Sequence, residues 1–296
     1  MENNICKALL LNRQIRAVCI NSTRIVDRLI QIHGLTPVCA AALGRTVSAT
    51  ALLASGLKNP EDSITVTIRG DGAAGAIVTA CDGSLKTLRG YVDNPRVTLP
   101  LSSDGKLDVG GAVGANGNLT VIKDIGLKKP YVGRTALVSG EIAEDFTRYL
   151  AESEQQPSIV SLGVLIAPDG SCKSAGGIIL DLLPGYSEQA LAAAEQAAVK
   201  LADISRVIEG LSPEQYIDLT LEYLGAEIIG GANAELNCKC GDGAIERAVL
   251  ALGEEDAFLL LKERGKVSIR CHFCAKEYVF GAKKLKELFD RARGGA

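Results

Sequence analysis

The stretch CKC at residues 238–240, followed after thirty residues by CHFC at residues 271–274, decides how the end of this chain folds. Two close cysteine pairs can bring four thiolates together, and four thiolates form a tetrahedral ligand set for Zn²⁺. The first pair has C-x-C spacing, so its loop is tighter than the commoner C-x-x-C knuckle. The motif predicts one zinc ion per chain, bound by Cys238, Cys240, Cys271 and Cys274. A zinc ion that only staples a small domain would give the same pattern.

The cysteines lie in residues 232–296, which we expect to form a small zinc-binding α+β domain. The segment holds 12 Lys and Arg against 10 Asp and Glu, so it lacks the strong basic patch typical of nucleic-acid binding. Structural zinc contributes about 10–16 kcal/mol of folding free energy in comparable units, so removing the metal should unfold this one. We expect helices at about 244–252, 254–263 and 283–293, and strands at 267–270 and 276–280.

Residues 184–231 are predicted to form an amphipathic helical linker. An Ala-rich helical pattern covers 187–208, and a capping box with proline at the first helical position starts a second helix at Ser212. Two such helices have little core of their own, so their apolar faces must pack on another element, and they are candidates for conditional unfolding. Undocking would expose the apolar side chains of these faces, namely Leu191, Leu201, Ile204, Ile208, Ile217, Leu221 and Leu224.

Residues 1–183 are predicted to form an α+β domain, a mainly antiparallel sheet with helices on one side. The helix from Pro37 to about Ala54 is apolar nearly all round, but Arg45 at its middle favours a buried helix over a membrane span. The stretch GDGAAG at 70–75 fits a dinucleotide motif, yet an extended pattern follows it, so we expect a turn between strands. Other strands are expected at 7–12, 15–20, 64–69, 85–92, 109–113, 119–123, 159–167 and 174–183, and a helix at 141–153.

The composition of the 296 residues narrows the class of protein. Hydrophobic residues make up 47%, charged residues 23%, and the net charge is −3, so no nucleic acid or membrane partner is expected. The first residues lack a basic secretory signal, which favours a reducing cytoplasm in which cysteines stay thiols. No Ser-His-Asp arrangement, P-loop or catalytic carboxylate pair is evident, so we expect no enzyme. Five cysteines outside the two motifs are expected to be small buried side chains: Cys6, Cys19, Cys39, Cys81 and Cys172.

Zinc-bound thiolates are also oxidisable nucleophiles. Lys239, Arg270 and Lys276 lie beside the ligands and favour the thiolate. Peroxide or hypochlorite converts one sulfur to a sulfenic acid, which condenses with a nearby thiol. The nearest partners lie within each pair, so we expect the disulfides Cys238–Cys240 and Cys271–Cys274. Their formation would release zinc, remove the main source of stability of the domain and uncover apolar surface at the linker.

At this point the chain resembles a known family, the redox-regulated 33-kDa chaperonins, or heat-shock protein 33. The likeness lies in the apolar helix after Pro37, SITVTIRGDG at 63–72, SAGGI at 174–178, and the cysteine motifs with EY at 277–278. The resemblance implies that the reduced zinc form is inactive. It also implies that the oxidised form is an ATP-independent holdase, often a homodimer, that binds unfolding proteins during oxidative stress. It carries the zinc and disulfide roles to the four motif cysteines and identifies no client-binding residues. We therefore expect client proteins to bind the apolar linker faces, through Leu191, Leu201, Ile204, Ile208, Ile217, Leu221 and Leu224.

Two other functions are compatible with the cysteine motifs. A zinc-ribbon adaptor that binds nucleic acid or protein without redox control would use the basic helix at 283–293. A thiol oxidoreductase would use the C-x-x-C at 271–274, but the usual thioredoxin-like setting is missing. His272 lies within this motif as an alternative ligand, although four sulfurs already complete a tetrahedron.

Overall fold

The computed structural model describes residues 3–294, and the chain divides into two compact units, Met1–Asn237 and Cys238–Ala296. The sequence pattern predicted that the last domain starts at residue 232, whereas the second unit of the structure starts at Cys238. The difference has a structural reason, because residues 227–232 pair with the first strand and the backbone of 235–237 bonds to 85–88. By their contacts, the linker residues 184–231 therefore belong to the first unit.

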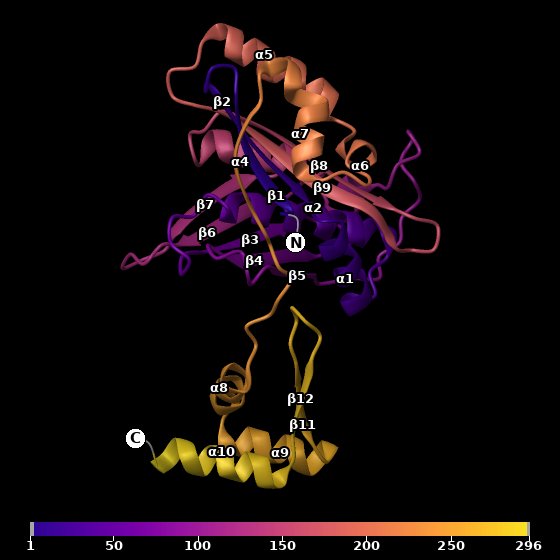
Figure 1. The fold of residues 1–296 in the computed structure, drawn as a ribbon. Coiled ribbons are helices and arrows are strands. Elements are labelled where there is room, and N and C mark those ends of the chain that lie inside the picture. The colour runs from indigo at the N-terminus through magenta and orange to yellow at the C-terminus, as the bar shows by residue number, and fades with distance from the viewer. Residues whose placement is uncertain (1–2, 295–296) are drawn as a thin grey trace. The chain divides into compact units, whose positions relative to one another are not determined.

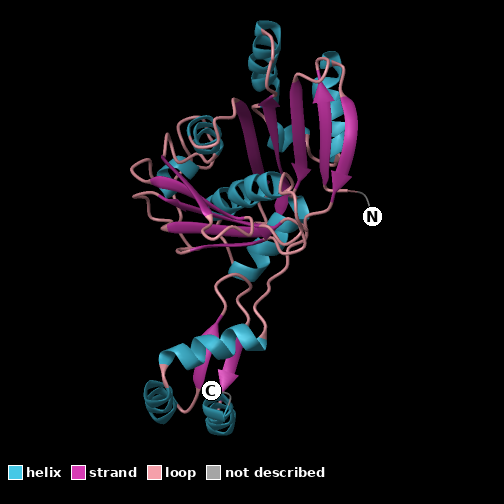
Figure 2. Cartoon of the chain, turned by 90° about the vertical axis from the view of Figure 1, so that its left-hand side faces the viewer, coloured by secondary structure: helices cyan, strands magenta, loops and turns pink. Residues whose placement is uncertain are grey.

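The strands of the first unit form two five-stranded antiparallel sheets, so the α+β class is confirmed but the single expected sheet is two (Figure 2). One sheet has the order β10-β1-β2-β9-β8 and the other the order β5-β4-β3-β6-β7. The first contains β1 (Ile5–Leu10), β2 (Ile15–Asn21), β8 (Ser158–Ile166), β9 (Cys172–Leu182) and β10 (Glu227–Ala232). The second contains β3 (Ser63–Arg69), β4 (Ala76–Asp82), β5 (Arg89–Val92), β6 (Asn118–Asp124) and β7 (Tyr131–Ala136).

Helix α2 (Pro37–Ala54) lies between the two sheets, in contact with β2, β8 and β9 on one side and β3, β4 and β5 on the other. Of the helices that the structure describes, only α2 is long and apolar enough to cross a membrane, and 83% of it is buried within the protein. The expectation of a buried core helix is confirmed. Three further helices of this part of the chain are α1 (Thr23–His33), α3 (Val109–Val113) and α4 (Ala143–Glu152).

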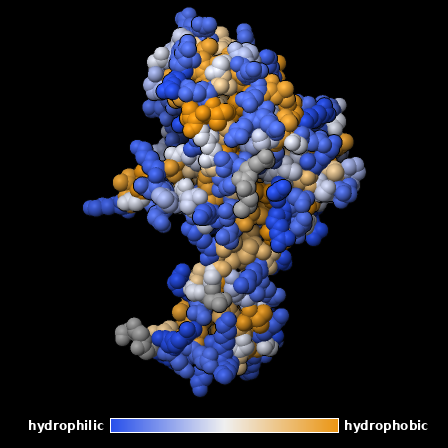
Figure 3. Space-filling view, in the orientation of Figure 1, coloured by the Kyte–Doolittle hydropathy of each residue, from blue (hydrophilic) through white to orange (hydrophobic). Residues whose placement is uncertain are grey.

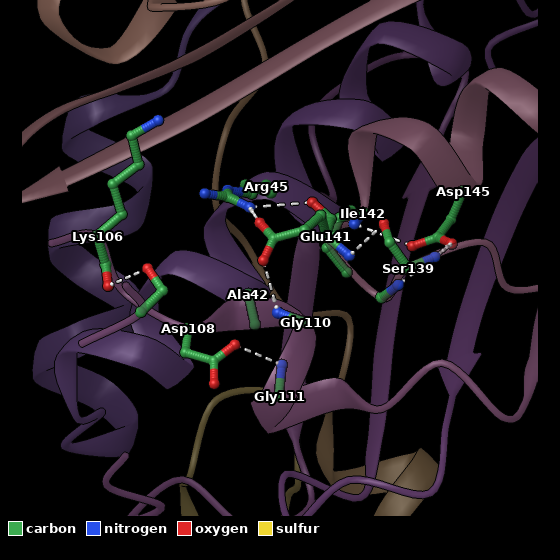
Figure 4. A network of polar contacts seen from close by, with 12 residues as sticks. Ala42, Arg45, Lys106, Asp108, Gly110, Gly111, Ser139, Glu141, Ile142 and Asp145 are labelled. Atoms are coloured by element: carbon green, nitrogen blue, oxygen red, sulfur yellow. Dashed lines mark hydrogen bonds and ion pairs between the residues drawn. The ribbon is translucent and has the colours of Figure 1, made fainter. Parts of the chain in front are cut away.

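The single charge in α2 is paired within the fold (Figure 4). Arg45 donates from Nη1 to Glu141 Oε2 at 2.5 Å and to the Glu141 carbonyl oxygen at 3.0 Å. The second carboxylate oxygen of Glu141 accepts from the Gly110 backbone N–H at 2.8 Å. Pairing and hydrogen bonding lower the cost of burying this cation, although Arg45 Nε is buried without a hydrogen-bond partner among the described residues. The charge therefore connects the central helix to α3 and to the segment before α4.

Some local predictions were wrong, and the reasons are physical. Residues 109–113 are the helix α3 rather than a strand, capped by the Asp108 carboxylate, which accepts from the Gly111 N–H at 2.8 Å. A five-residue apolar run has no decisive periodicity. The helix expected over 187–208 is interrupted at residues 202–203. Strands β7 and β10 were not predicted, because β7 is exposed at alternate positions and β10 along most of its length.

The sheet that contains β1 has two covered faces. Alternation along the strand sends Ile5 to the core around α2, whereas its neighbour Cys6 joins a second core on the opposite face. The linker helices cover this second core: α5 and α6 contact β8 and β9, and α7 contacts β1 and β2. These helices and the short 3-10 turn after them are α5 (Glu188–Leu201), α6 (Ile204–Val207), α7 (Pro213–Leu221) and η1 (Glu222–Leu224). The expectation that the linker packs on another element is confirmed.

The second unit is small and has its own core. It consists of α8 (Asp242–Leu252), α9 (Glu254–Arg264), β11 (Val267–Arg270), β12 (Glu277–Phe280) and α10 (Ala282–Gly294). The predicted helices and strands of this segment are confirmed, with bounds shifted by a few residues. Strands β11 and β12 form a hairpin. The most buried side chains of the unit include Phe280 on β12, Leu285 on α10 and Val249 on α8.

The packing of α7 contains one unfavourable group. Tyr216 is fully buried in the core under the linker helices, and its hydroxyl has no hydrogen-bond partner among the residues that the structure describes. An unsatisfied buried hydroxyl costs about 1–3 kcal/mol. The helix is therefore held by apolar contact alone at this position, against a polar penalty.

We expect Tyr216→Phe to stabilise the docking of α7 by about 1 kcal/mol, because it removes the unsatisfied hydroxyl and keeps the ring. Amide hydrogen exchange of residues 213–221 in the full chain measures the effect. Tyr223→Phe is the matched control, since this ring is 49% exposed. Faster exchange in Tyr216→Phe than in the parent chain would show that the hydroxyl is satisfied by a bound water.

Candidate metal centre and client surface

The four motif cysteines are positioned by two separate pieces of backbone. Cys238 and Cys240 lie in the extended segment that leads into α8, and Cys271 and Cys274 lie in the turn between β11 and β12. The hairpin closes this turn through the Cys271 N–H, which donates to the Lys276 carbonyl at 2.9 Å. One cysteine pair is thus held by local hairpin geometry, whereas the other must be brought to it.

The structure brings the four sulfurs together. Cys238 Sγ lies 3.7 Å from Cys271 Sγ, and Cys240 Sγ lies 3.2 Å from Cys274 Sγ. All four sulfurs fall within 4.8 Å of one another. In a tetrahedron with Zn–S bonds of about 2.3 Å, neighbouring sulfurs are about 3.8 Å apart. The spacing and the donor set therefore fit a tetrahedral thiophilic cation such as Zn²⁺.

Tyr278, on β12, supports the first cysteine pair from the hairpin. Its hydroxyl lies 2.6 Å from the Cys240 carbonyl oxygen and 3.4 Å from Cys240 Sγ. The ring is buried, with Lys276 Nζ 4.7 Å from its centre. A hydrogen bond to a ligand atom orients the ligand and tunes its electron density. Tyr278 therefore links the segment before α8 to the hairpin that carries the other two sulfurs.

Ionisation of the cluster is unequal. Burial raises the pKa of Cys238 well above its usual range and also raises that of Cys274. Burial acts in the same direction on Cys240, but hydrogen bonds from Tyr278 and from the neighbouring thiols outweigh it and lower its pKa to about 7. Neighbouring thiolates repel one another, so ionisation of one sulfur disfavours ionisation of the next. A divalent metal is the group that lets all four be thiolates.

His272 does not belong to the group of metal-ligating side chains that the structure brings together, which consists of the four thiols alone. The remaining cysteines lie elsewhere and are buried, as the sequence predicted. As residues, the four motif cysteines are only partly buried, and Cys271 is the most enclosed ligand of the group, so small oxidants reach the cluster through the other three. The group thus combines a complete ligand set with access from solvent.

The candidate client-binding residues form one buried set with a single exception. Leu191 is 38% exposed, whereas Leu224 is 7% exposed and the others are fully buried against the sheet. They share this core with Ile178 and Leu180 of β9, so the linker helices and the sheet cover each other. Other apolar side chains of this region are exposed, including Val199 and Leu219. Figure 3 shows apolar groups among the polar ones on the surface of the first unit. The buried members are Leu201, Ile204, Ile208, Ile217, Leu221 and Leu224.

Two tyrosines with roles in these sites were not singled out by sequence reasoning. Tyr278 was noted only as part of a resemblance, and Tyr216 only as part of a helix. Their roles depend on contacts between distant segments, Tyr278 with Cys240 and Tyr216 with the sheet. A buried-aromatic pattern beside a metal motif was the only available signal.

Fold and site together define a class: a two-sheet α+β protein with helices folded on one sheet, followed by a small four-cysteine unit able to hold a metal (Figure 1).

A model of the family described as Hsp33 protein matches residues 3–281. A 33 kDa chaperonin from Thermoanaerobacter sp. (strain X514) is 41% identical over 97% of this chain and 98% of its own length. A 33 kDa chaperonin from Alkaliphilus metalliredigens is 40% identical over 98% of this chain and 99% of its own.

A solved structure supports the same assignment. The crystal structure of a 33 kDa chaperonin from Thermotoga maritima, named as a heat shock protein 33 homolog, superposes with a TM-score of 0.88. The identity is 32%, and the match covers 99% of this chain and 100% of the other. The chain belongs to the Hsp33 family. Members of this family are chaperones rather than enzymes, and unfolded client proteins are the partners of a chaperone.

We expect Tyr278→Phe to weaken zinc binding about tenfold, because it removes the hydrogen bond that orients Cys240. Competition with a chromogenic chelator measures the affinity, and far-UV circular dichroism of the metal-loaded chain checks the fold. Tyr186→Phe in the first unit is the control, since it removes a hydroxyl from a 37% exposed ring. Equal affinities in all three chains would show that the Tyr278 hydroxyl only packs.

Proposed function

We propose that this protein is a redox-regulated, ATP-independent holdase that binds unfolding proteins during oxidative stress. One Zn²⁺ per chain would be held by Cys238, Cys240, Cys271 and Cys274 in the reduced, inactive state. The observation that carries the proposal is the approach of these four sulfurs within 4.8 Å, at partly exposed positions, in a unit with a small core. When bound, the ion supplies the cross-link between the two cysteine segments and keeps all four sulfurs ionised.

The chemistry of the switch follows from thiolate oxidation. A peroxide oxidises one sulfur to a sulfenic acid and is reduced to water, and the sulfenic acid condenses with its neighbour, releasing a second water. The proposed pairs are Cys238–Cys240 and Cys271–Cys274. Short contacts in the reduced cluster also join the two segments, Cys238 to Cys271 and Cys240 to Cys274. Disulfide mapping therefore has to distinguish pairing within each motif from pairing between the two motifs. Either pairing would leave no free thiolates to bind the metal.

Loss of the ligand set is proposed to reach the linker through the chain itself. Cys238 follows directly on Asn237, whose N–H donates to the Leu88 carbonyl at 2.9 Å. Strand β10 precedes this contact, is exposed along most of its length and pairs only with β1. Helix α7 lies just before β10. Unfolding of the second unit would therefore free β10 first and then α7, and would uncover the apolar core between α7 and the sheet.

The oxidised form is proposed to act as a homodimer in the cytoplasm. An uncovered edge strand and an uncovered apolar face are surfaces through which two copies of a chain associate. The family assignment and the exposed pairing edge of β10 support this part of the proposal.

The first prediction of this proposal concerns stoichiometry. Treatment of the reduced, zinc-loaded chain with hydrogen peroxide should release one zinc per chain as two disulfides form. Suppression of the aggregation of a thermally unfolding client should appear over the same time course. Cys39→Ala is the control, since this thiol is buried in the other core and should leave all three readouts unchanged. Zinc release without client protection would show that the cluster has only a structural role.

The second prediction separates the client surface from the switch. Ile217→Ala should cost about 2–5 kcal/mol of docking energy, because Ile217 lies on α7 and is fully buried against the sheet. We expect this variant to protect clients while still reduced and zinc-loaded. Leu219→Ala, two residues away on the same helix and 67% exposed, should behave like the parent chain. Client protection that still required oxidant in Ile217→Ala would place the client surface elsewhere.

A further inference from the structure

Two cysteines outside the candidate metal centre face each other on adjacent strands. Cys6 on β1 and Cys19 on β2 are directly paired in the antiparallel register, and they are 1% and 0% exposed. Residues opposite each other in an antiparallel pair project to the same face of the sheet. Both thiols lie in the core beneath the linker helices rather than in the core around α2. On its other side, Cys6 is paired with Gly231 of β10, which has no side chain.

Helix α7 is the element that covers this thiol pair. Its contacts are with β1 and β2, and Tyr216 and Ile217 share the core with both cysteines. Burial, with the nearby carboxylates Glu214 and Asp218 of α7, raises the pKa of the Cys6 thiol to about 11. Burial also raises the pKa of Cys19 well above its usual range. The thiolate is the reactive form, so both cysteines are inert while α7 is docked.

The backbone spacing allows a bond between the two sulfurs with some closure of the strands. The Asn21 N–H donates to the Asn4 carbonyl at 2.9 Å, so alternate pairs, the Cys6–Cys19 pair included, are hydrogen-bonded pairs. The Cα atoms of such pairs are about 5.5 Å apart, which is within the range of disulfides. Their Cβ atoms start about 5 Å apart, and a disulfide needs about 4 Å. The bond would be strained and readily reduced by small thiols.

We infer that Cys6 and Cys19 are a second oxidation site, which α7 shields and which closes to a cross-strand disulfide when α7 leaves the sheet. The inference rests on the proposed function in one respect, the release of α7. Hydrogen peroxide oxidises one thiol to a sulfenic acid and leaves as water. The second thiol then attacks that sulfur, the S–S bond forms and a second water is released, so two electrons pass from the two sulfurs to the peroxide.

The disulfide would change the surface of the sheet on which α7 packs when the helix redocks. Drawing the two sulfurs together alters the surface on which Tyr216 and Ile217 pack, and a closely packed interface tolerates such changes poorly. The helix would then redock fully only after a thiol reductant has opened the bond. This site therefore acts later than the four-cysteine cluster and delays the return to the closed state.

The test uses the full chain and a variant that frees α7 without touching the four-cysteine cluster. Reduced, zinc-loaded Ile217→Ala is treated with hydrogen peroxide, and disulfide-linked peptides are identified by mass spectrometry. Leu219→Ala, sampled over the same period and before its zinc is released, is the matched control with α7 docked. Alkylation by N-ethylmaleimide is followed at Cys6, Cys19 and Cys39, and Cys39, in the core around α2, reports global unfolding. The parent chain, oxidised until its zinc is released, is examined in parallel.

The expected result is a Cys6–Cys19 linked peptide in Ile217→Ala and in the oxidised parent chain, with at least tenfold less in Leu219→Ala and an unreacted Cys39. The same peptide in Ile217→Ala, but not in the parent chain oxidised until its zinc is released, would uphold the site and contradict release of α7 by the cluster. Rapid alkylation of Cys6 and Cys19 without the linked peptide would overturn the inference and leave the proposed function intact. A second experiment compares the double variant Cys6→Ala, Cys19→Ala with the parent chain. The double variant should return to the closed state faster after reductant is added, and an unchanged rate would overturn the proposed delay.

Discussion

The apolar contact between the linker helices and one face of the β10-β1-β2-β9-β8 sheet is the constraint on which the rest of the structure depends. The opposite face of that sheet is covered permanently, because α2 is held between two sheets and its one charge is neutralised by Glu141. The first face has no such second sheet. Its cover is a set of short helices that carry apolar residues mainly on the buried side and an unsatisfied tyrosine hydroxyl. One core is therefore enclosed between two sheets, whereas the other is covered by helices alone.

The two units differ in how their stability is supplied. In the first unit, two extensive cores bury most of the large apolar side chains. In the second, a short hairpin and its helices bury far fewer, and four sulfurs and Tyr278 hold the segment before α8 to the hairpin. Small units of this kind depend on a cross-link, so loss of the cross-link is a large fraction of their stability. The four motif cysteines thus lie in the unit with the smaller core.

The chemistry of the candidate metal centre was readable from the sequence because it is local: each cysteine pair is a few residues long, and the helices around it follow a clear periodicity. The burial of Leu201, Ile204 and Ile217 was readable for the same reason. The second sheet was not, since nothing in a strand pattern says which strands pair. Strand β10 was missed because Gly230 and Gly231 weaken its pattern and its pairing partner is β1. The hydrogen bond from Tyr278 to Cys240 depends on the tertiary fold and has no local signature.

The pairing of β1 with β10 has a consequence for the way this protein is made. The first strand of the chain cannot complete its sheet until residues 227–232 have been synthesised, which takes roughly 10–50 s at ordinary elongation rates. Until then, the free edge of β1 and the apolar face later covered by α7 are open on a nascent chain. A newly made molecule therefore exposes, for a time, the same surfaces that the proposed switch would uncover. They are covered only when the last part of the first unit has been made, so a truncated chain that ends before β10 would leave the edge of β1 exposed.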